Sequence, residues 1–515
     1  MNTIVTRHDG PAESARSALS WRLELLVVGA IGLVGLLLRL RFLGVPLRYD
    51  EAFTYQTYAV LPDPRVIALS YTFPNNHILN SLAIHYAIPI FGDGKWALRC
   101  PAFLTGVGSV FAAWWAGREV SGPVAAWWAA GLVAVSSPLV DFSGNGRGYE
   151  LGVFFVLVSV ALAARLLRGP GPWAVRGLIA TSVLGVWSVP TTAYGLVPLA
   201  VWMVGCVIFQ AQPNRRARLR RAGRVAGVFI LAAGLSELLL APLTIQPGWN
   251  FVGSLPHTWP AIRGVAQATW GQWWRGAPHP AVWVISLAAL ASLPLHRRIS
   301  RPGLAVPLGA ALALGLAAVV LFSSKLGPYP RAWTAVLPVF LVVAALGLAA
   351  LQDLLAALAA RKAPAVGRVP PWAWVLLVVA VLGVRAAQTS PAGAEEAPQS
   401  DNHLGAWLRE HEPGRQLLIQ YGSFGPNIDL ELAFEHYHQA AVGGVTPQQA
   451  RSGRVLVVQS RGQAAIAKAQ VAAAGGQVTS APPVPVHDFE YISLYDVAVV
   501  PPPAGQGLDR RGPRG

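Results

Sequence analysis

The stretch "LLVVGAIGLVGLLL", Leu25–Leu38, decides the fold class. It contains no charged side chain, and a helix that crosses the hydrocarbon core of a bilayer needs about 20 predominantly apolar residues. With its flanking residues the run covers about 22–42. No Ala-x-Ala-like cleavage site precedes the following "RLRF". The run therefore predicts a retained first membrane helix and not a cleaved signal peptide.

Apolar runs of this kind recur along the chain and predict about eleven transmembrane helices. The expected spans are 22–42, 97–117, 123–140, 149–167, 177–193, 195–211, 225–245, 281–296, 303–322, 332–351 and 372–389. The composition agrees, because 54% of the residues are hydrophobic and only 12% are charged, whereas soluble domains carry about 25% charged residues. The expected fold class is an α-helical polytopic membrane protein with a small C-terminal α/β domain outside the cytoplasm.

The distribution of arginine predicts the orientation in the membrane. When the sides alternate from one span to the next, the loops "RRARLRRAGR" (215–224) and "HRRISR" (296–301) fall on the side of the N-terminus. Basic loops favour the cytoplasm, so the N-terminus is expected inside and the C-terminal domain outside a bacterial inner (plasma) membrane. The net charge of +16 belongs to the hydrophobic part of the chain. It forms no basic face with stacking aromatics, which argues against nucleic acid as a partner.

From about residue 390 the composition becomes that of a soluble domain. "DNHLGAWLREH" and "GQAAIAKAQVAAAGG" indicate helices, the second ended by glycines, whereas "RQLLIQYG", "RVLVVQSRG" and "FEYISLYDVAVV" indicate strands. These patterns predict an α/β domain with three or four strands. The expected division is a membrane domain over 1–389, an α/β domain over 390–500 and a disordered tail over 501–515.

An acidic pair follows the first span in "RYDEAFTY", Arg48–Tyr55. Asp50 and Glu51 have an ordinary explanation, since solvated carboxylates are common where a helix leaves the membrane. However, Arg39 lies at the outer end of the span, the side that the positive-inside rule disfavours. Charges at membrane level are costly, so these residues form a functional hypothesis.

Cations occur at two further outer helix ends. "SGNGRGYE" carries Arg147 and Tyr149, and "SSKLGPYPRAW" carries Lys325 and Arg331. The simple interpretation is that the arginines extend to the interface and the tyrosine anchors a helix there. The functional interpretation is that they converge on one anionic ligand, because arginine binds phosphate through two parallel hydrogen bonds and lysine acts as a point charge.

A sugar joined to a lipid through one phosphate would suit such an arrangement. Its leaving group is a phosphate monoester with a second pKa of about 6, so it departs as a dianion without a general acid. Preorganised positive charge stabilises that dianion, and one carboxylate deprotonates the attacking hydroxyl. No DxD-type metal motif occurs in the outer loops. We therefore expect no cofactor and a metal-independent reaction, with a divalent metal as the remaining alternative.

The order of "RYDEAFTY", "PNNHILNSL…FGDGKWALRCPAFL" and "SSPLVDFSGNGRGYELGVFF" resembles the membrane glycosyltransferases of the C superclass. The resemblance is strongest to family 39 and its bacterial relatives, which include protein O-mannosyltransferases and the lipid A aminoarabinose transferase. It covers roughly residues 20–350. It implies a polytopic, inverting enzyme that uses a polyprenyl-phosphate sugar.

The resemblance also implies roles for individual residues. Asp50 becomes the catalytic base and Glu51 its neighbour, while Arg147, Tyr149, Arg331 and Lys325 become candidates for binding the donor phosphate. "NNH" departs from the prolines that many relatives carry at this point, which leaves Asn76 and His77 open. His77 either orients an acceptor or caps a helix. Arg99 serves the site or extends to the interface, and Arg39 is a further candidate.

The sequence therefore predicts a polyprenyl-phosphate-sugar-dependent glycosyltransferase, of hexosyl or pentosyl type, that acts in the bilayer on an envelope acceptor. The acceptor is a glycan, a lipid or a protein. The alternatives are a transporter or flippase of lipid-linked sugars, which should show mid-membrane charges and repeat symmetry, a polysaccharide ligase or polymerase, and a non-catalytic membrane scaffold.

Overall fold

The protein is described here by a computed structural model. The described residues are 11–44, 48–69, 76–92, 94–169, 171–210, 215–244, 254–323, 326–362, 369–388, 404–412, 417–419, 440–442, 452–460, 462, 464–488 and 492–501. The chain forms two compact units. The first contains Met1–Val45 and Leu61–Ser390, and the second contains Pro46–Val60 and Pro391–Gly515.

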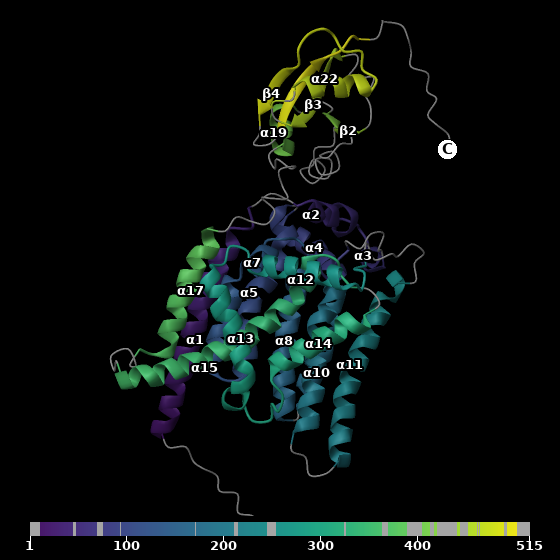
Figure 1. Cartoon of the computed structure of the whole chain (residues 1–515). Helices are drawn as coiled ribbons and strands as arrows, with labels where there is room; N and C mark the ends of the chain where they lie inside the picture. The colour runs from purple at the N-terminus through teal and green to yellow at the C-terminus, as the bar shows by residue number, and fades with distance from the viewer. Residues whose placement is uncertain are drawn as a thin grey trace, which may run out of the picture. The chain divides into compact units, whose positions relative to one another are not determined.

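The first unit is a bundle of helices, most of them long (Figure 1). Its helices are α1 (Pro11–Leu40), α3 (Pro64–Leu69), α4 (Ile78–Phe91), α5 (Lys95–Val120), α6 (Pro123–Val135), α7 (Ser137–Ser143), α8 (Tyr149–Arg168), α9 (Pro172–Ser188), η2 (Pro190–Thr192), α10 (Ala193–Phe209), α11 (Arg215–Thr244), α12 (Trp259–Trp273), α13 (His279–Ile299), α14 (Leu308–Phe322), η3 (Pro330–Val336), α15 (Leu337–Lys362) and α17 (Pro371–Gln388). Helix α5 packs on α6 and α8, and α13 packs on α15.

The helical, membrane-spanning character of this unit is confirmed, but the count of eleven spans is not. Eight helices of the described chain are long and apolar enough to cross a bilayer, and the bent pair α6–α7 would make nine. Each expected span corresponds to a helix of the structure, yet α9 has only 17 residues and α14 only 15. The chain is a multi-pass membrane protein, and eleven crossings stay a prediction.

The expected span 123–140 is broken in the structure. Helix α6 ends at Val135, Ser136 is extended, and α7 leaves at an angle of 62° with Pro138 in its first turn. Proline there donates no N–H and prevents a continuous helix. The break leaves carbonyl groups at the end of α6 without helical partners, and in a membrane-embedded bundle these groups require other donors.

Arg39 supplies those donors. Its guanidinium donates to the carbonyl oxygens of Ala134 at 3.1 Å and Val133 at 3.3 Å. It also donates to Ser143 Oγ on α7 at 3.0 Å, and the charge of Glu150 attracts it. The Arg39 side chain is fully buried. It therefore joins both sides of the α6–α7 break to α1.

Replacing Arg39 with methionine is expected to lower the free energy of unfolding by about 3 kcal/mol, because the variant leaves a buried carboxylate and two carbonyls without this cation. The measurement is thermal or denaturant unfolding of the purified protein in detergent. Arg41→Met is the matched control, since Arg41 is exposed two residues away, and it should change stability by less than about 0.5 kcal/mol. Equal stability of the two variants would contradict the role given to Arg39.

Two glycines allow helices of this bundle to approach closely. A Cβ atom at Gly347 of α15 would clash with the carbonyl oxygen of Ala288 on α13. A Cβ atom at Gly106 of α5 would clash with the hydroxyl of Ser143, which accepts the Arg39 hydrogen bond. The glycine at 106 thus lets α5 pass beside the break without displacing the Arg39 contact.

The second unit holds a five-stranded sheet in the order β2-β1-β3-β5-β4. Its elements are α2 (Tyr49–Thr54), the π-helical turn η1 (Tyr55–Ala59), α19 (Leu404–His411), β1 (Leu417–Ile419), β2 (Ala440–Val442), β3 (Arg454–Ser460), α22 (Ala464–Ala473), β4 (Val484–Asp488) and β5 (Ile492–Ala498). Strand β1 is parallel to β2 and β3, and β5 is antiparallel to β3 and β4. Helix α22 covers the sheet through Ala467 and Val471, which pack with Val455, Val457 and Val497.

The expected α/β fold of this domain is confirmed, with β2 and β4 as strands that the sequence patterns missed. The glycine end of α22 is also confirmed, because Gly475 has a φ of 88°. The segment Pro46–Val60, assigned to the membrane domain by sequence, groups with the second unit. Of the expected tail 501–515, all but Pro501 lies outside the described residues.

Candidate active site

The glycine-rich turn between α7 and α8 is buried and passes close to neighbouring backbone. A Cβ atom at Gly148 would lie 2.7 Å from the carbonyl oxygen of Ser188, and one at Gly146 would lie 2.8 Å from Leu98 Cγ. The turn is fixed on its other side by Asn80 of α4, whose Nδ2 donates to the carbonyl oxygen of Gly146 at 2.9 Å. The glycines therefore let the turn enter the bundle, and Arg147 enters with it.

Arg147 and Tyr149 contact His77 at the start of α4. The Gly148 N–H donates to His77 Nδ1 at 2.8 Å, and Arg147 Nη2 lies 3.2 Å from His77 Nε2. The rings of His77 and Tyr149 meet edge to face with centroids 4.9 Å apart. His77 is 3% exposed and Arg147 is 2% exposed. Residues that are 70 positions apart in the sequence thus share one buried environment.

Arg331 contributes its charge to the same environment. Burial lowers the pKa of His77 well below its ordinary value, and the positive charges of Arg147 and Arg331 lower it further. The imidazole is therefore neutral at pH 7. Arg331 itself lies 5.0 Å from the ring centroid of Tyr329. We call His77, Arg147, Tyr149 and Arg331 the His77 cluster.

The loop before Arg331 is held by hydrogen bonds to the bundle. The Gly327 N–H donates to the Tyr194 hydroxyl at 3.0 Å, and Trp333 Nε1 donates to the Gly327 carbonyl at 3.1 Å. These bonds fix the entry into η3, which begins at Pro330. These bonds therefore hold Arg331, the second residue of η3, in a defined position near His77 at the start of α4. Lys325, predicted from the same loop, lies outside the described residues.

An apolar cavity of about 260 Å³ adjoins η3. Its wall includes Trp333 and Val336 of η3, Trp270 and Trp273 of α12, and Val320 of α14. Trp270 and Trp273 thus line an apolar cavity, and Arg331 lies two residues before Trp333 on the same element.

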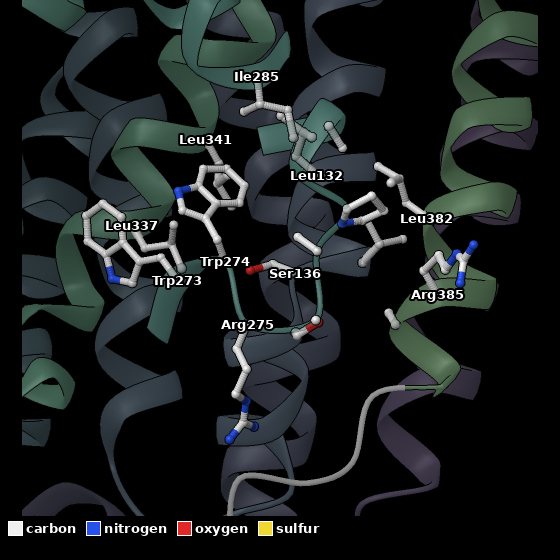
Figure 2. A pocket seen from close by; sticks show the side chains of 17 residues that line it. Leu132, Ser136, Trp273, Trp274, Arg275, Ile285, Leu337, Leu341, Leu382 and Arg385 are labelled. Atoms are coloured by element: carbon white, nitrogen blue, oxygen red, sulfur yellow. The ribbon is translucent and has the colours of Figure 1, made fainter. Parts of the chain in front are cut away.

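A smaller cavity of about 50 Å³ lies at the α6–α7 break (Figure 2). Trp273, Trp274 and Leu341 line one side, and Leu382 and Arg385 of α17 line the other. Arg275 points away from the apolar side chains in this view and forms an ion pair with Asp141 of α7 at 3.8 Å. The ion pair ties the α12–α13 connection to the helix that leads into the glycine-rich turn.

Three of the predicted site residues bind backbone or a neighbouring helix. Arg99 Nη1 donates to the carbonyl of Leu43 at 2.8 Å. Asn76 Nδ2 donates to the carbonyl of Ile67 at 2.9 Å, and its oxygen accepts from Ser81 at 2.8 Å. Arg39 bridges the helix break described above. These contacts hold the segments that surround the His77 cluster, and the cluster itself does not include these residues.

Asp50 and Glu51 lie in the first turn of α2, in the second unit. Glu51 is fully buried, and its Oε2 accepts the backbone N–H of Arg48 at 3.0 Å. The Glu51 N–H donates back to the Arg48 carbonyl at 2.9 Å. This is the carboxylate half of a capping box, which stabilises the start of a helix. Asp50 is partly exposed, so the two neighbouring acids have different environments.

Sequence reasoning missed Asn80, which anchors the glycine-rich turn. A signal was present, because the polar residues Asn76, His77, Asn80 and Ser81 recur every three or four positions around an otherwise apolar helix start. Residues with that spacing share one helical face. Among the described residues, no group of three or more His, Cys, Asp or Glu side chains could hold a metal ion.

The fold of the chain has a counterpart among solved structures. The structure is similar to the ArnT protein of Cupriavidus metallidurans in the apo state, with a TM-score of 0.52 and 15% identity over 93% of this chain and 98% of the other. No protein-family model and no curated protein sequence matches the chain. The resemblance noticed in the sequence is thus confirmed for the fold.

Two other solved structures are similar at lower scores. ArnT from Cupriavidus metallidurans bound to undecaprenyl phosphate has a TM-score of 0.48 and 15% identity, covering 92% of this chain and 97% of the other. The mycobacterial arabinofuranosyltransferase AftD has a TM-score of 0.48 and 15% identity, covering 92% of this chain and 40% of its own.

Proposed function

We propose that the protein is an inverting glycosyltransferase that moves a sugar from a polyprenyl-phosphate donor to a glycan, lipid or protein of the cell envelope. The observation that supports this best is the composition of η3. Arg331 belongs to the His77 cluster, while Trp333 and Val336 line the apolar cavity of about 260 Å³. A polyprenyl phosphate joins one anionic group to an apolar chain. Nearby residues of η3 thus offer a positive charge for the phosphate, at Arg331, and an apolar surface for the chain, at Trp333 and Val336.

The proposed reaction needs one proton acceptor and positive charge. Asp50 takes the proton of the acceptor hydroxyl, the hydroxyl oxygen bonds to the anomeric carbon with inversion, and the bond from that carbon to the phosphate oxygen breaks. The polyprenyl phosphate leaves with the electron pair as a dianion, because the second pKa of a phosphate monoester is about 6. Arg147 and Arg331 stabilise the charge that develops on the phosphate.

The contacts within α2 favour Asp50 over Glu51 as the base. The Glu51 carboxylate is fully buried and accepts the Arg48 N–H. This carboxylate therefore stabilises the start of the helix. Asp50 is partly exposed, and a base must reach an incoming hydroxyl.

The rival functions differ from this one in what happens to the glycosidic bond. A transporter or flippase of lipid-linked sugars leaves the sugar on its lipid, and a scaffold moves nothing. Membrane lipids labelled with a radioactive sugar, mixed with the purified protein and envelope extract, separate these cases. The proposal expects label to leave the organic phase and enter the acceptor fraction, with no loss of rate in EDTA.

Mass spectrometry of the cell envelope with and without the protein then identifies the acceptor. A mass difference equal to one hexose, pentose or amino sugar is expected on one envelope component. Label that stays on lipid under all conditions, together with an unchanged envelope, would contradict the proposal. A rate that EDTA abolishes would instead contradict the metal-independent reaction.

A further inference from the structure

His77 lies between two groups that can only donate hydrogen bonds. The first is the backbone N–H of Gly148, 2.8 Å from Nδ1. The second is the guanidinium of Arg147, whose Nη2 is 3.2 Å from Nε2. A neutral imidazole has one acceptor nitrogen and one N–H. The two neighbours therefore cannot both be satisfied by the ring.

The backbone contact determines which nitrogen carries the proton. The Gly148 N–H is fixed by its peptide plane at the N-cap of α8, and it points at Nδ1, so Nδ1 is the acceptor. The proton of the neutral ring is then on Nε2. Consequently the 3.2 Å approach to Arg147 joins one donor to another and is not a hydrogen bond.

We infer that His77 Nε2–H and Arg147 together bind one oxygen of an oxyanion, which accepts a hydrogen bond from each. Two neighbouring donors can share a single acceptor oxygen, as donors do in sites that stabilise anionic oxygens. The position of the ring proton follows from the contact between His77 and Gly148, whatever further interactions Arg147 makes. It gives His77 a binding role in addition to its structural contact with Gly148.

The ionisation state of His77 fits a neutral donor. Burial and the charges of Arg147 and Arg331 keep its pKa well below the ordinary value, so the site presents two guanidinium charges and one neutral N–H. That set can bind a phosphate without transferring a proton to it. The identity of the oxyanion rests on the proposed function: it is the phosphate of the polyprenyl donor. Inorganic phosphate offers the same chemistry without the chain.

Two substitutions test the roles of the two ring nitrogens of His77 separately. In His77→Asn the side-chain oxygen replaces Nδ1 as acceptor for the Gly148 N–H, but no donor reaches the Nε2 position. In His77→Gln the amide N–H₂ reaches the Nε2 position, but the acceptor beside Gly148 is lost. If His77 has only a structural role, the asparagine variant should be closer to wild type than the glutamine variant. If His77 binds an oxyanion, the glutamine variant should keep more of the affinity for that anion than the asparagine variant.

The experiment measures the affinity of the purified full-length protein for undecaprenyl phosphate, undecaprenol and inorganic phosphate. In His77→Asn, affinity for undecaprenyl phosphate should fall about tenfold or more, the usual effect of losing a hydrogen bond to a charged group. Affinity for undecaprenol and the unfolding temperature without ligand should stay close to wild type. His77→Gln should bind the phosphate lipid within about threefold of wild type, because an amide donor replaces the lost one.

Wild-type affinity for undecaprenyl phosphate in His77→Asn would overturn the inference, as would an equal loss for phosphate lipid and undecaprenol. A different result would contradict the proposed function. If wild-type protein does not distinguish undecaprenyl phosphate from undecaprenol, the lipid donor is contradicted. In that case, inorganic phosphate binding that His77→Asn weakens and His77→Gln retains would still support the oxyanion pair, and its insensitivity to both would overturn it.

Discussion

Asp50→Asn is expected to lower the rate of sugar transfer by about 10³-fold, because asparagine has the shape of aspartate but cannot accept the proton of the acceptor hydroxyl. Binding of the polyprenyl-phosphate sugar should remain within about threefold, since the base acts on the acceptor. The backbone carbonyl of Asp50 still accepts the Thr54 hydroxyl, a bond of 2.8 Å. The helix α2 should therefore form in the variant as in the wild type.

Two controls make this result specific. Asp63→Asn removes an exposed carboxylate that pairs with Arg65, whose side chain is 87% exposed, and should leave transfer unchanged. Glu51→Gln keeps an oxygen that accepts the Arg48 N–H, so its effect on transfer should be much smaller than that of Asp50→Asn. Transfer, donor affinity and unfolding temperature are measured for all three. Full activity in Asp50→Asn would remove the assignment of the base.

Much of the fold could be predicted from hydropathy, because crossing a bilayer imposes a length and an apolar composition that sequence displays directly. The break at Ser136 could not, since hydropathy carries no information about backbone direction. Pro138 was the available sign of it. The β2 and β4 strands were missed for a related reason: β2 has three residues and β4 begins "VPVH", too short or too polar for an alternating pattern.

The candidate site was predictable only in part. The outer cations Arg147 and Arg331 were found because positive charge on that side contradicts a general rule. Arg39 and Arg99 contradict the same rule, yet in the structure they bind carbonyl groups of helix α6 and of the turn after α1. Sequence cannot distinguish these uses, because a carbonyl without a helical partner arises from tertiary structure and not from residue type.

His77 shows this limit most clearly. From sequence alone it either orients an acceptor or caps a helix. The structure excludes a side-chain cap on its own helix α4 and gives Nδ1 to the N–H at the start of α8 instead. That partner is 71 positions away in the sequence, and only the fold brings it within reach. The role of Nε2 follows from the same geometry.

Arg147→Ala is expected to lower kcat/KM for transfer by about 10² to 10³, the usual effect of removing a preorganised donor to a developing anion. Affinity for undecaprenyl phosphate should fall as well, because in the proposed mechanism Arg147 contacts the phosphate before and after the bond breaks. Arg147→Lys keeps the charge but loses the planar pair of donors, so it should retain more activity than alanine and less than wild type.

Arg263→Ala is the matched control, since Arg263 is an exposed arginine on α12, and it should transfer sugar at the wild-type rate. Arg147 is buried against Tyr149, with its guanidinium 5.9 Å from the ring centroid, so the unfolding temperature of each variant is measured in parallel. If the alanine variant folds and transfers sugar within about threefold of wild type, the His77 cluster does not bind the leaving phosphate. A loss shared by alanine and lysine would show that charge alone is insufficient and that the fork geometry of the guanidinium is needed.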